Sequence, residues 1–307
     1  METDHRVNAF HSGAVLKTPV AIFIFNRPDL TERVFVEIRR ARPVSLLVIA
    51  DGPRKRVASD RRKCGAARAA ATAVDWPCTV RTNFSSTNLG CQKRMASGLD
   101  WVFRECRQAI VLEDDCLPHP DFFAFCDQML RRYRDEPKVM QISGTNVQEG
   151  QSRTRFSYYF SRYNHVWGWA TWRRAWRLYD VKATGWEKTI WSKRYRKIFT
   201  GNAERRLWHN LFHEVTQGRV DTWDCQWFLT ILRAGAFTIT PDVNLISNLG
   251  FRRDATHTRL TRPGKPTAPL GNLKNPSRIR WCKRADHWYM RQFLAQHQRW
   301  QKRNEAG

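Results

Sequence analysis

Three adjacent carboxylates, Glu113, Asp114 and Asp115, directly follow a short apolar run at residues 109–112. Negative charges this close repel one another, and a divalent cation placed among them removes much of that cost. In an extended segment Glu113 and Asp115 point to the same side and Asp114 to the other. Carboxylate oxygens suit Mg²⁺ or Mn²⁺. The triplet therefore predicts a divalent-metal site, and the alternative is a solvated acidic turn ahead of a helix beginning near Asp121.

Strands that alternate with helices precede this triplet. Apolar runs bounded by turn signals predict strands at residues 19–25, 44–50, 78–81 and 109–112. Periodicity and composition predict helices at residues 30–38, 59–74 and 91–103. This alternation predicts an α/β fold with a mostly parallel, doubly wound sheet and helices on both faces. Ligands of such sheets bind beyond the carboxyl ends of the strands, where Asp51 and the triplet both lie.

Composition excludes several classes of protein. Of the 307 residues, 42% are hydrophobic and 12% aromatic, too many core formers for a disordered or fibrous chain. The longest clean apolar run, residues 20–25, is far shorter than the roughly 20 residues that span a bilayer. The start shows no signal-peptide pattern, so we expect a cytoplasmic protein. Eight cysteines without a Cys-x-x-Cys pair predict neither a zinc site nor a disulfide framework.

The net charge of +25, from 53 basic and 28 acidic residues, attracts polyanions. It does not choose among nucleic acid, anionic lipid and phosphorylated ligands. One alternative is therefore a basic nucleic-acid-binding protein whose aromatic side chains stack on bases. The basic residues form no recognisable nucleic-acid-binding motif, and the acidic triplet opposes a polyanion unless metal neutralises it. We expect no specific nucleic-acid partner.

Several short segments, in their order along residues 18–260, resemble a GT-A-fold glycosyltransferase that uses a nucleotide-diphospho-sugar. The resemblance is to a bacterial group that is distantly similar to N-acetylglucosaminyltransferase I and to family 2 enzymes. The segments are Asn26-Arg27-Pro28, Ala50-Asp51-Gly52-Pro53, Asn88-Leu89-Gly90, Leu112-Glu113-Asp114-Asp115, Trp167-Gly168-Trp169-Ala170-Thr171-Trp172, Trp223-Asp224-Cys225-Gln226-Trp227, Asn248-Leu249-Gly250-Phe251 and Asp254-Ala255-Thr256-His257-Thr258.

The resemblance implies that the loops after the first two strands embrace the donor nucleoside. Asn26 and Arg27 would line the base and phosphate side. Asp51 would accept a hydrogen bond from the nucleobase or the ribose. The alternative for Asp51 is an ordinary turn residue in an Asp-Gly-Pro sequence.

A second implied donor segment begins at Asn88. Asn88 and Gly90 would bring backbone close to the nucleotide, with Lys93 or Arg94 near the phosphates. The alternative is an ordinary helix N-terminus that follows a glycine. Arginines at residues 252–253 depart from the small residue expected there, and either grip the diphosphate or mark a different loop.

For the metal, the triplet takes the place of the family's Asp-x-Asp motif. Asp115 would be the direct metal ligand, while Glu113 and Asp114 would reach ribose, sugar hydroxyls or metal-bound water. His257 would be a further ligand, because GT-A enzymes often supply a late histidine, and a neutral imidazole suits manganese. Without the resemblance, His257 reads as a surface or satisfied core residue.

Asp224 is the candidate catalytic base that would remove the proton from the acceptor hydroxyl. It lies in an aromatic stretch, and its place relative to the other segments matches the resemblance. Asp221 is the competing carboxylate. The alternative is that Asp224 caps a helix over residues 225–232.

Trp167, Trp169 and Trp172 are candidates for a wall on which a sugar stacks, and Gly168 indicates a tight backbone in a loop over the donor sugar. The alternative is packing in the core, which is what most of the 14 tryptophans must do.

These observations divide the chain into a leader (1–17), a glycosyltransferase domain (18–262) and a basic amphipathic helical extension (263–307). The extension either lies on an anionic membrane surface or packs on the sheet. The predicted function is hexosyl transfer (EC 2.4) from a nucleotide-sugar to a glycan or lipid-linked acceptor, in cell-envelope polysaccharide synthesis. The enzyme would be cytoplasmic, with peripheral contact at the inner face of the membrane. A sugar nucleotidyltransferase is the other enzymatic alternative.

Overall fold

The computed structural model describes residues 15–193, 195–252 and 263–305, the side chains at 300–305 excepted. The strands are β1 (Val20–Ile24), β2 (Ser45–Ala50), β3 (Thr79–Phe84), β4 (Gln108–Glu113), β5 (Cys116–Pro118), β6 (Val139–Ser143), β7 (Tyr158–Ser161), β8 (Trp169–Trp172), β9 (Phe237–Pro241) and β10 (Ile246–Asn248). The helices are α1 (Pro28–Ala41), α2 (Ala58–Thr72), α3 (Cys91–Glu105), α4 (Asp121–Arg132), α5 (Arg173–Trp176), α6 (Trp186–Trp191), α7 (Asn202–Thr216), α8 (Asp224–Arg233) and α9 (Lys283–Glu305).

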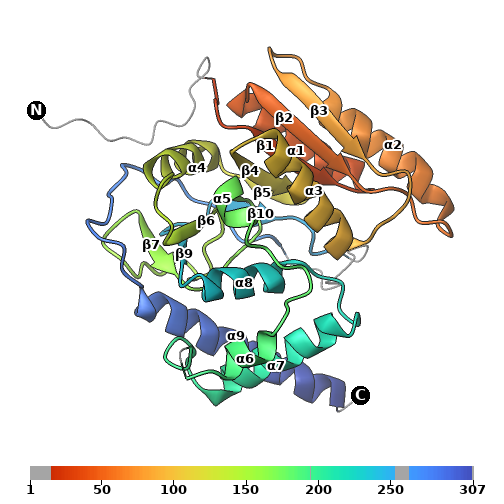
Figure 1. The fold of residues 1–307 in the computed structure, drawn as a ribbon. Coiled ribbons are helices and arrows are strands. Elements are labelled where there is room, and N and C mark those ends of the chain that lie inside the picture. The colour runs from red at the N-terminus through yellow and green to blue at the C-terminus, as the bar shows by residue number, and fades with distance from the viewer. Residues whose placement is uncertain (1–14, 194, 253–262, 306–307) are drawn as a thin grey trace, which may run out of the picture.

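A mixed sheet of eight strands, in the order β3-β2-β1-β4-β8-β6-β9-β7, runs through the molecule (Figure 1). The strands of its first half, β3 to β4, are all parallel, as the alternation in the sequence predicts. The second half is mixed, because β8 enters between β4 and β6 and runs antiparallel to both. A separate two-stranded sheet pairs β10 with β5.

Helices cover both faces of this sheet, and the side chains of β1 show how. Val20, Ile22 and Ile24 join a hydrophobic cluster that contains residues of α1, α2 and α4. Ala21 and Phe23 point to the opposite face and join a cluster with residues of α3 and α8. The two-residue alternation of a strand thus splits β1 between two cores. The predicted covering of both faces is confirmed.

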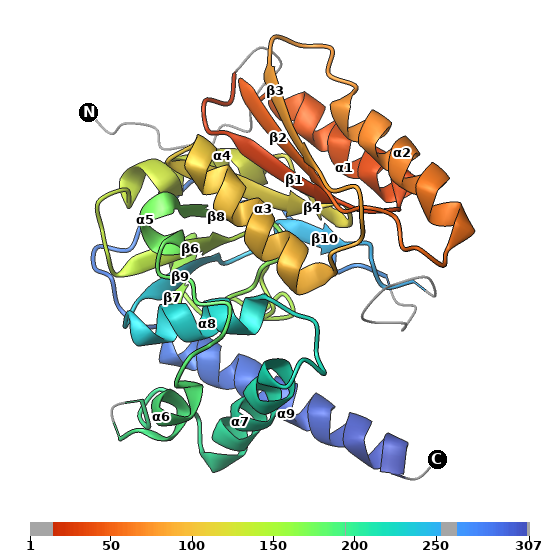
Figure 2. The same cartoon turned by 45° about the vertical axis from the view of Figure 1, so that its right-hand side comes forward.

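Helix α9 lies beside α6 and α7, at the end of the molecule away from β1 to β3 (Figures 1 and 2). Met290 is fully buried in a third cluster with residues of α7 and α8. Asp286 accepts hydrogen bonds from Ser161 Oγ (2.6 Å), the Arg162 amide (2.7 Å) and Trp281 Nε1 (2.6 Å). The beginning of α9 is therefore fixed to β7 by packing and polar contacts. The boundaries expected at residues 18 and 263 stay predictions.

Within the described ranges, no helix combines the length and the hydropathy that crossing a membrane requires. The eight cysteines all fall within those ranges, and each is a free thiol. No disulfide joins them in this structure.

Candidate active site

A cavity of about 310 Å³ opens beyond the carboxyl ends of β1, β2 and β4, where the sequence places the ligand site. Its wall combines carboxylates, arginines and aromatic side chains from segments that are far apart in the sequence. The lining residues are Phe23, Ile24, Phe25, Arg27, Asp51, Arg54, Asn88, Gly90, Cys91, Arg94, Met95, Glu113, Asp114, Asp115, Trp167, Asp221, Asn248, Gly250 and Phe251.

The acidic triplet lies at the end of β4, and all three of its members line this cavity. Asp114 is tied to the end of β1, because its amide donates to the Phe23 carbonyl (2.9 Å) and its Oδ2 accepts from the Phe25 amide (3.2 Å). Asp114 and Asp115 form a turn rather than an extended segment. The predicted alternation, with Asp114 directed away from its neighbours, is therefore wrong.

Arg27, at the N-cap of α1, brings a positive charge to this turn. Its guanidinium forms an ion pair with Asp114 and a second one with Asp115, where Nη1 lies 2.9 Å from Oδ2. The carboxylates hold the pKa of Arg27 above its usual range, although burial acts in the opposite direction. Arg27 thus partly compensates the charge of the triplet.

Burial controls the protonation of two members of the triplet. It raises the pKa of Glu113 to about 8, with further contributions from the charges of Asp115 and Asp114, while Arg27 opposes the shift. Burial also raises the pKa of Asp114, which the nearby Arg27 lowers only in part. A cation of higher charge at this position would stabilise the ionised forms.

This shift predicts a pH dependence of stability. Because the pKa of Glu113 rises from 4.5 to about 8 on folding, the folded protein binds a proton between these two pH values that the unfolded chain has lost, and this stabilisation is lost as the pH rises through that range. In the presence of a chelator, the free energy of unfolding should therefore fall more steeply between pH 5 and 8 in the wild type than in a Glu113→Gln variant. Urea denaturation across that range measures both slopes, and equal slopes would contradict the assignment.

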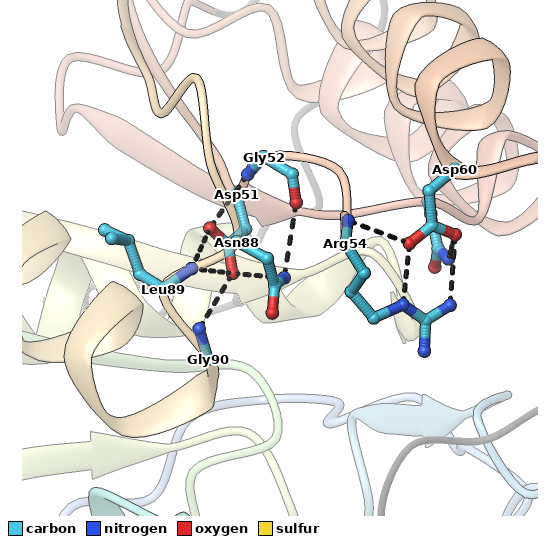
Figure 3. Close-up of polar contacts among 8 residues, drawn as sticks. Asp51, Gly52, Arg54, Asp60, Asn88, Leu89 and Gly90 are labelled. Carbon is cyan, nitrogen blue, oxygen red and sulfur yellow. Dashed lines mark hydrogen bonds and ion pairs between the residues drawn. The ribbon is translucent and has the colours of Figure 1, made fainter. Parts of the chain in front are cut away.

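Asp51 organises the loops around the end of β2 (Figure 3). Its carboxylate accepts from the amides of Gly52 (2.8 Å), Leu89 (2.9 Å) and Gly90 (3.2 Å) and from Asn88 Nδ2 (2.9 Å). These four donors match the roughly four lone-pair positions of a carboxylate. Asp51 therefore ties the two predicted donor loops together at the cavity wall. Its direct hydrogen bond to a nucleobase or ribose stays a prediction.

A second network, on the right of Figure 3, involves Arg54 and Asp60. Arg54 Nε donates to Asp60 Oδ2 (2.6 Å) and Nη2 to Oδ1 (3.0 Å), and Asn26 Nδ2 donates to the same Oδ1 (2.8 Å). These bonds lower the pKa of Asp60 to about 2, and Arg54 contributes most to this shift. Arg54 lines the cavity, whereas Asn26 does not. Asn26 thus binds Asp60 rather than facing the cavity, and its predicted contact with the donor is untested.

The N-terminus of α3 forms another part of the wall. Gly90 has a positive φ of 83°, which glycine adopts without strain. The amides of Cys91 and Gln92 each donate to the carboxylate of Asp221 at 2.8 Å. Arg94 is buried and donates through Nη2 to the Asn83 side chain (2.7 Å). Asp221 therefore closes this side of the cavity from a segment 130 residues away.

The segment after β10 packs directly against Asp115. The Leu249 amide donates to the Asp115 carbonyl (2.8 Å), and the Gly250 amide donates to Asn248 Oδ1 (2.7 Å). A Cβ at Gly250 would overlap Asp115 Oδ2. The sequence shows Asn248-Leu249-Gly250 as a motif but assigns it no role, because only the fold brings it to the triplet.

A Gly250→Ala substitution should therefore displace the Asp115 carboxylate. Displacement of a reacting group by about 1 Å costs roughly 10²-fold in rate, so turnover should fall by about that factor. Thermal stability should change little, since the overlap is with the end of a side chain. Gly65→Ala is the control, because a Cβ there meets no atom within 4 Å. Full turnover in the Gly250→Ala variant would show that the position of Asp115 does not matter.

Only one of the three candidate stacking tryptophans reaches the cavity. Trp167 lines it and meets Phe251 edge-on, with ring centroids 5.5 Å apart. Trp169 and Trp172 are buried in the sheet as part of β8. The prediction that Trp169 and Trp172 stack on a sugar is therefore wrong, because strand pairing directs both side chains into the cores.

Gly168 has a positive φ of 61°, as a tight backbone requires. A Cβ at this position would overlap the side chain of Ile246 in β10. The glycine thus permits close packing between β8 and β10, next to Trp167. Its predicted place in a loop over a donor sugar is untested.

Asp224 is the first residue of α8, the N-cap is Trp223 and no side chain caps the helix, so the alternative that Asp224 caps it is wrong. Its Oδ1 accepts from Thr222 Oγ1, and its side chain is not among the cavity-lining groups. It lies near enough to Glu113 to raise the pKa of that residue, as the last of several contributions. The structure thus brings Asp221 to the cavity wall but not Asp224. The choice between them as base is untested.

The described residues contain no group of three or more His, Cys, Asp and Glu side chains arranged to hold a metal ion. His257 lies outside the described residues. The donor set nevertheless fits a hard cation, because the side chains of Glu113, Asp114 and Asp115 all line the cavity and such cations prefer carboxylate oxygens.

This protein is only distantly similar to the known proteins with which it was compared. No protein-family model and no curated protein matches the sequence. The mannosyltransferase PcManGT from Pyrobaculum calidifontis, solved in complex with GDP-Man and Mn²⁺, is similar over 73% of this chain and 70% of its own, with 16% identity and a TM-score of 0.40.

Two further solved structures are similar over about the same share of the chain. UDP-glucose pyrophosphorylase complexed with UDP-glucose matches 71% of this chain and 97% of its own, with 8% identity and a TM-score of 0.32. The apo form of mouse xyloside xylosyltransferase 1 matches 70% and 81%, with 10% identity and a TM-score of 0.34. With TM-scores of 0.40 or less, these three likenesses assign no chemistry to the site.

Proposed function

We propose that this protein is a metal-dependent GT-A glycosyltransferase that moves a hexosyl group from a nucleotide-diphosphate donor to a glycan or lipid-linked acceptor. The observation that supports the proposal is the cavity beyond β1, β2 and β4, where the acidic triplet, three arginines and an aromatic side chain meet. Its volume falls within the usual range of about 300–1,000 Å³ for small-ligand pockets. Carboxylates suit a divalent cation and arginines suit a diphosphate, so one cavity offers partners for both.

In this proposal Asp115 holds the cation, with Glu113 beside it and His257 as a further ligand. Mn²⁺ or Mg²⁺ bound there would offset the negative charge of the departing diphosphate. Glu113 and Asp114 otherwise contact ribose, sugar hydroxyls or metal-bound water. Arg27 and Arg94 face the phosphates.

The donor nucleoside lies along the wall that Asp51 holds together. Asp51, Asn88 and Gly90 meet there through the hydrogen bonds already described, so the base and ribose have a preformed surface. We also assign Asn26 to the donor, which it would reach by exchanging its hydrogen bond to Asp60 for one to the nucleotide. Trp167, which lines the cavity, and the neighbouring Gly168 are the residues that we assign to the donor sugar.

The reaction breaks the bond between the sugar anomeric carbon and the diphosphate and forms a bond to the acceptor oxygen. A carboxylate takes the proton of the acceptor hydroxyl, and the nucleoside diphosphate leaves. We assign this base to Asp224. Asp221 is the weaker candidate, because both of its oxygens already accept amide hydrogens of α3.

We also infer peripheral contact with an anionic membrane at the cytoplasmic face, next to acceptors of cell-envelope polysaccharide synthesis. The support is α9, which exposes Phe293 together with Arg291 and Arg299. The protein should sediment with vesicles that contain anionic lipid and release at high salt. Equal binding to neutral vesicles, or none to either, would exclude this contact.

Thermal denaturation in the presence of nucleotide-sugars tests the proposed function. Any ligand that binds the native state alone raises the transition temperature. We expect UDP-, GDP- or dTDP-sugars of one base class to raise it, and only with Mn²⁺ or Mg²⁺ rather than chelator. No shift with any nucleotide, together with a shift on adding RNA or DNA, would instead support the nucleic-acid-binding alternative.

A further inference from the structure

Arg27 pairs with two of the three carboxylates on which the proposed cation depends. Its guanidinium contacts the carboxylates of both Asp114 and Asp115. The contacts are protected from solvent, since the Asp114 side chain is 3% exposed and the Asp115 side chain 14%. Screening by water is weak at such a site, so these ion pairs are strong competitors for other charges.

The Asp115 oxygen that Arg27 contacts, Oδ2, is also the oxygen that packs against Gly250. Oδ2 of Asp115 lies 2.9 Å from Arg27 Nη1 and against Gly250, which has no side chain there. A divalent cation ligated by this oxygen would lie about 2.0–2.2 Å from it for Mg²⁺ or Mn²⁺. A guanidinium at its observed place and a cation this close would repel each other across the same carboxylate.

We propose that Arg27 and a divalent cation compete for the carboxylates of Asp114 and Asp115, so that the cation binds only after the Arg27 guanidinium has moved away. The inference rests on the proposed function for the identity of the cation. A displaced Arg27 stays at the cavity, since the residue lines it, and a donor diphosphate is the partner of opposite charge there. The protein therefore binds the cation more tightly when the donor is present than when it is absent.

Titration of the purified protein with Mn²⁺ alone, followed by electron paramagnetic resonance of the free ion, tests this competition. An Arg27→Gln variant should bind Mn²⁺ roughly tenfold more tightly than the wild type, which corresponds to about 1.4 kcal/mol. An Arg27→Lys variant, which keeps a charge beside the buried carboxylates but cannot bridge them, should lie between the two. The lysine variant also serves if Arg27→Gln does not fold.

Two controls locate the effect. Arg39→Gln removes an arginine that also pairs with a carboxylate, that of Asp75, but does not line the cavity, so its Mn²⁺ affinity should equal that of the wild type. Adding Asp115→Asn to the Arg27→Gln variant should abolish the gain, because the freed carboxylate is then missing.

Equal Mn²⁺ affinity in the wild type and both Arg27 variants would overturn the inference, and so would the absence of Mn²⁺ binding from all three. Thermal denaturation of the wild type with UDP-, GDP- and dTDP-sugars separates this failure from a failure of the proposed function. If nucleotide-sugars stabilise the wild type while Arg27 variants leave Mn²⁺ affinity unchanged, only the competition is wrong. If Arg27→Gln gains affinity but no nucleotide-sugar binds, only the proposed function is wrong.

Discussion

An Asp115→Ala variant should lose roughly 10³-fold or more in the rate of sugar transfer, because it removes the proposed direct ligand of the cation that stabilises the leaving group. The fold should persist, since Asp114 keeps its own contacts with Arg27 and with the amide of Phe25. Initial rates of nucleoside diphosphate release, together with circular dichroism, measure the two properties separately.

Asp75→Ala is the matched control for this loss. Asp75 is also paired with an arginine, Arg39, but its side chain is 63% exposed and far from the cavity lining. Its removal should leave the rate unchanged. The nucleic-acid-binding alternative predicts the opposite pattern for Asp115→Ala, namely equal or tighter affinity for RNA or DNA as a negative charge is lost. Wild-type transfer rates in the Asp115→Ala variant would refute the metal assignment.

A Trp169→Ala variant should be destabilised by about 3–5 kcal/mol, the usual cost of removing a large buried side chain. Trp169 is completely buried, and its ring stacks on Trp223 with centroids 5.4 Å apart and lies 6.0 Å from Trp227. Its removal opens a void between β8 and α8. Urea denaturation gives the difference in the free energy of unfolding.

Trp167→Ala is the natural comparison, since Trp167 lies two residues away but faces the cavity. It should lose donor affinity with a smaller loss of stability. If Trp169→Ala instead kept its stability and lost donor affinity, the sugar-stacking interpretation of Trp169 would be correct and its burial irrelevant.

The first half of the fold was predictable because its signals are local. The runs at residues 19–25, 44–50, 78–81 and 109–112 correspond to β1, β2, β3 and β4, with ends that differ by a few residues. Three of the four runs are apolar and each is bounded by a turn, and the helix between successive strands leaves parallel pairing as the simple arrangement.

The second half was not predictable in the same way. Strand β8 pairs with β4 across some 60 residues, and no local pattern specifies that partner or its antiparallel direction. The three tryptophans around Gly168 fit a sugar-binding loop and a buried strand equally well as a sequence. Only the pairing of Trp169 with Val111 decides which faces are buried.

The candidate site also has features that the sequence predicts and features that depend on long-range contacts. The position of Asp51 and the triplet at strand ends followed from the sequence, because the carboxyl ends of parallel strands meet at one edge. The contacts of these residues did not follow. Arg27 reaches Asp114 over 87 residues, and Asp221 reaches the start of α3 over 130. Such contacts depend on the assembled fold, and so do the pKa shifts that burial produces.

Phosphorus nuclear magnetic resonance of the reaction products tests the central claim most directly. The purified protein would be incubated with the nucleotide-sugar that stabilises it, a glycan or lipid-linked acceptor fraction, and Mn²⁺ or chelator. We predict that nucleoside diphosphate accumulates with Mn²⁺ and not with chelator. Formation of nucleoside triphosphate on adding inorganic diphosphate, without nucleoside diphosphate release, would contradict sugar transfer and identify a nucleotidyltransferase.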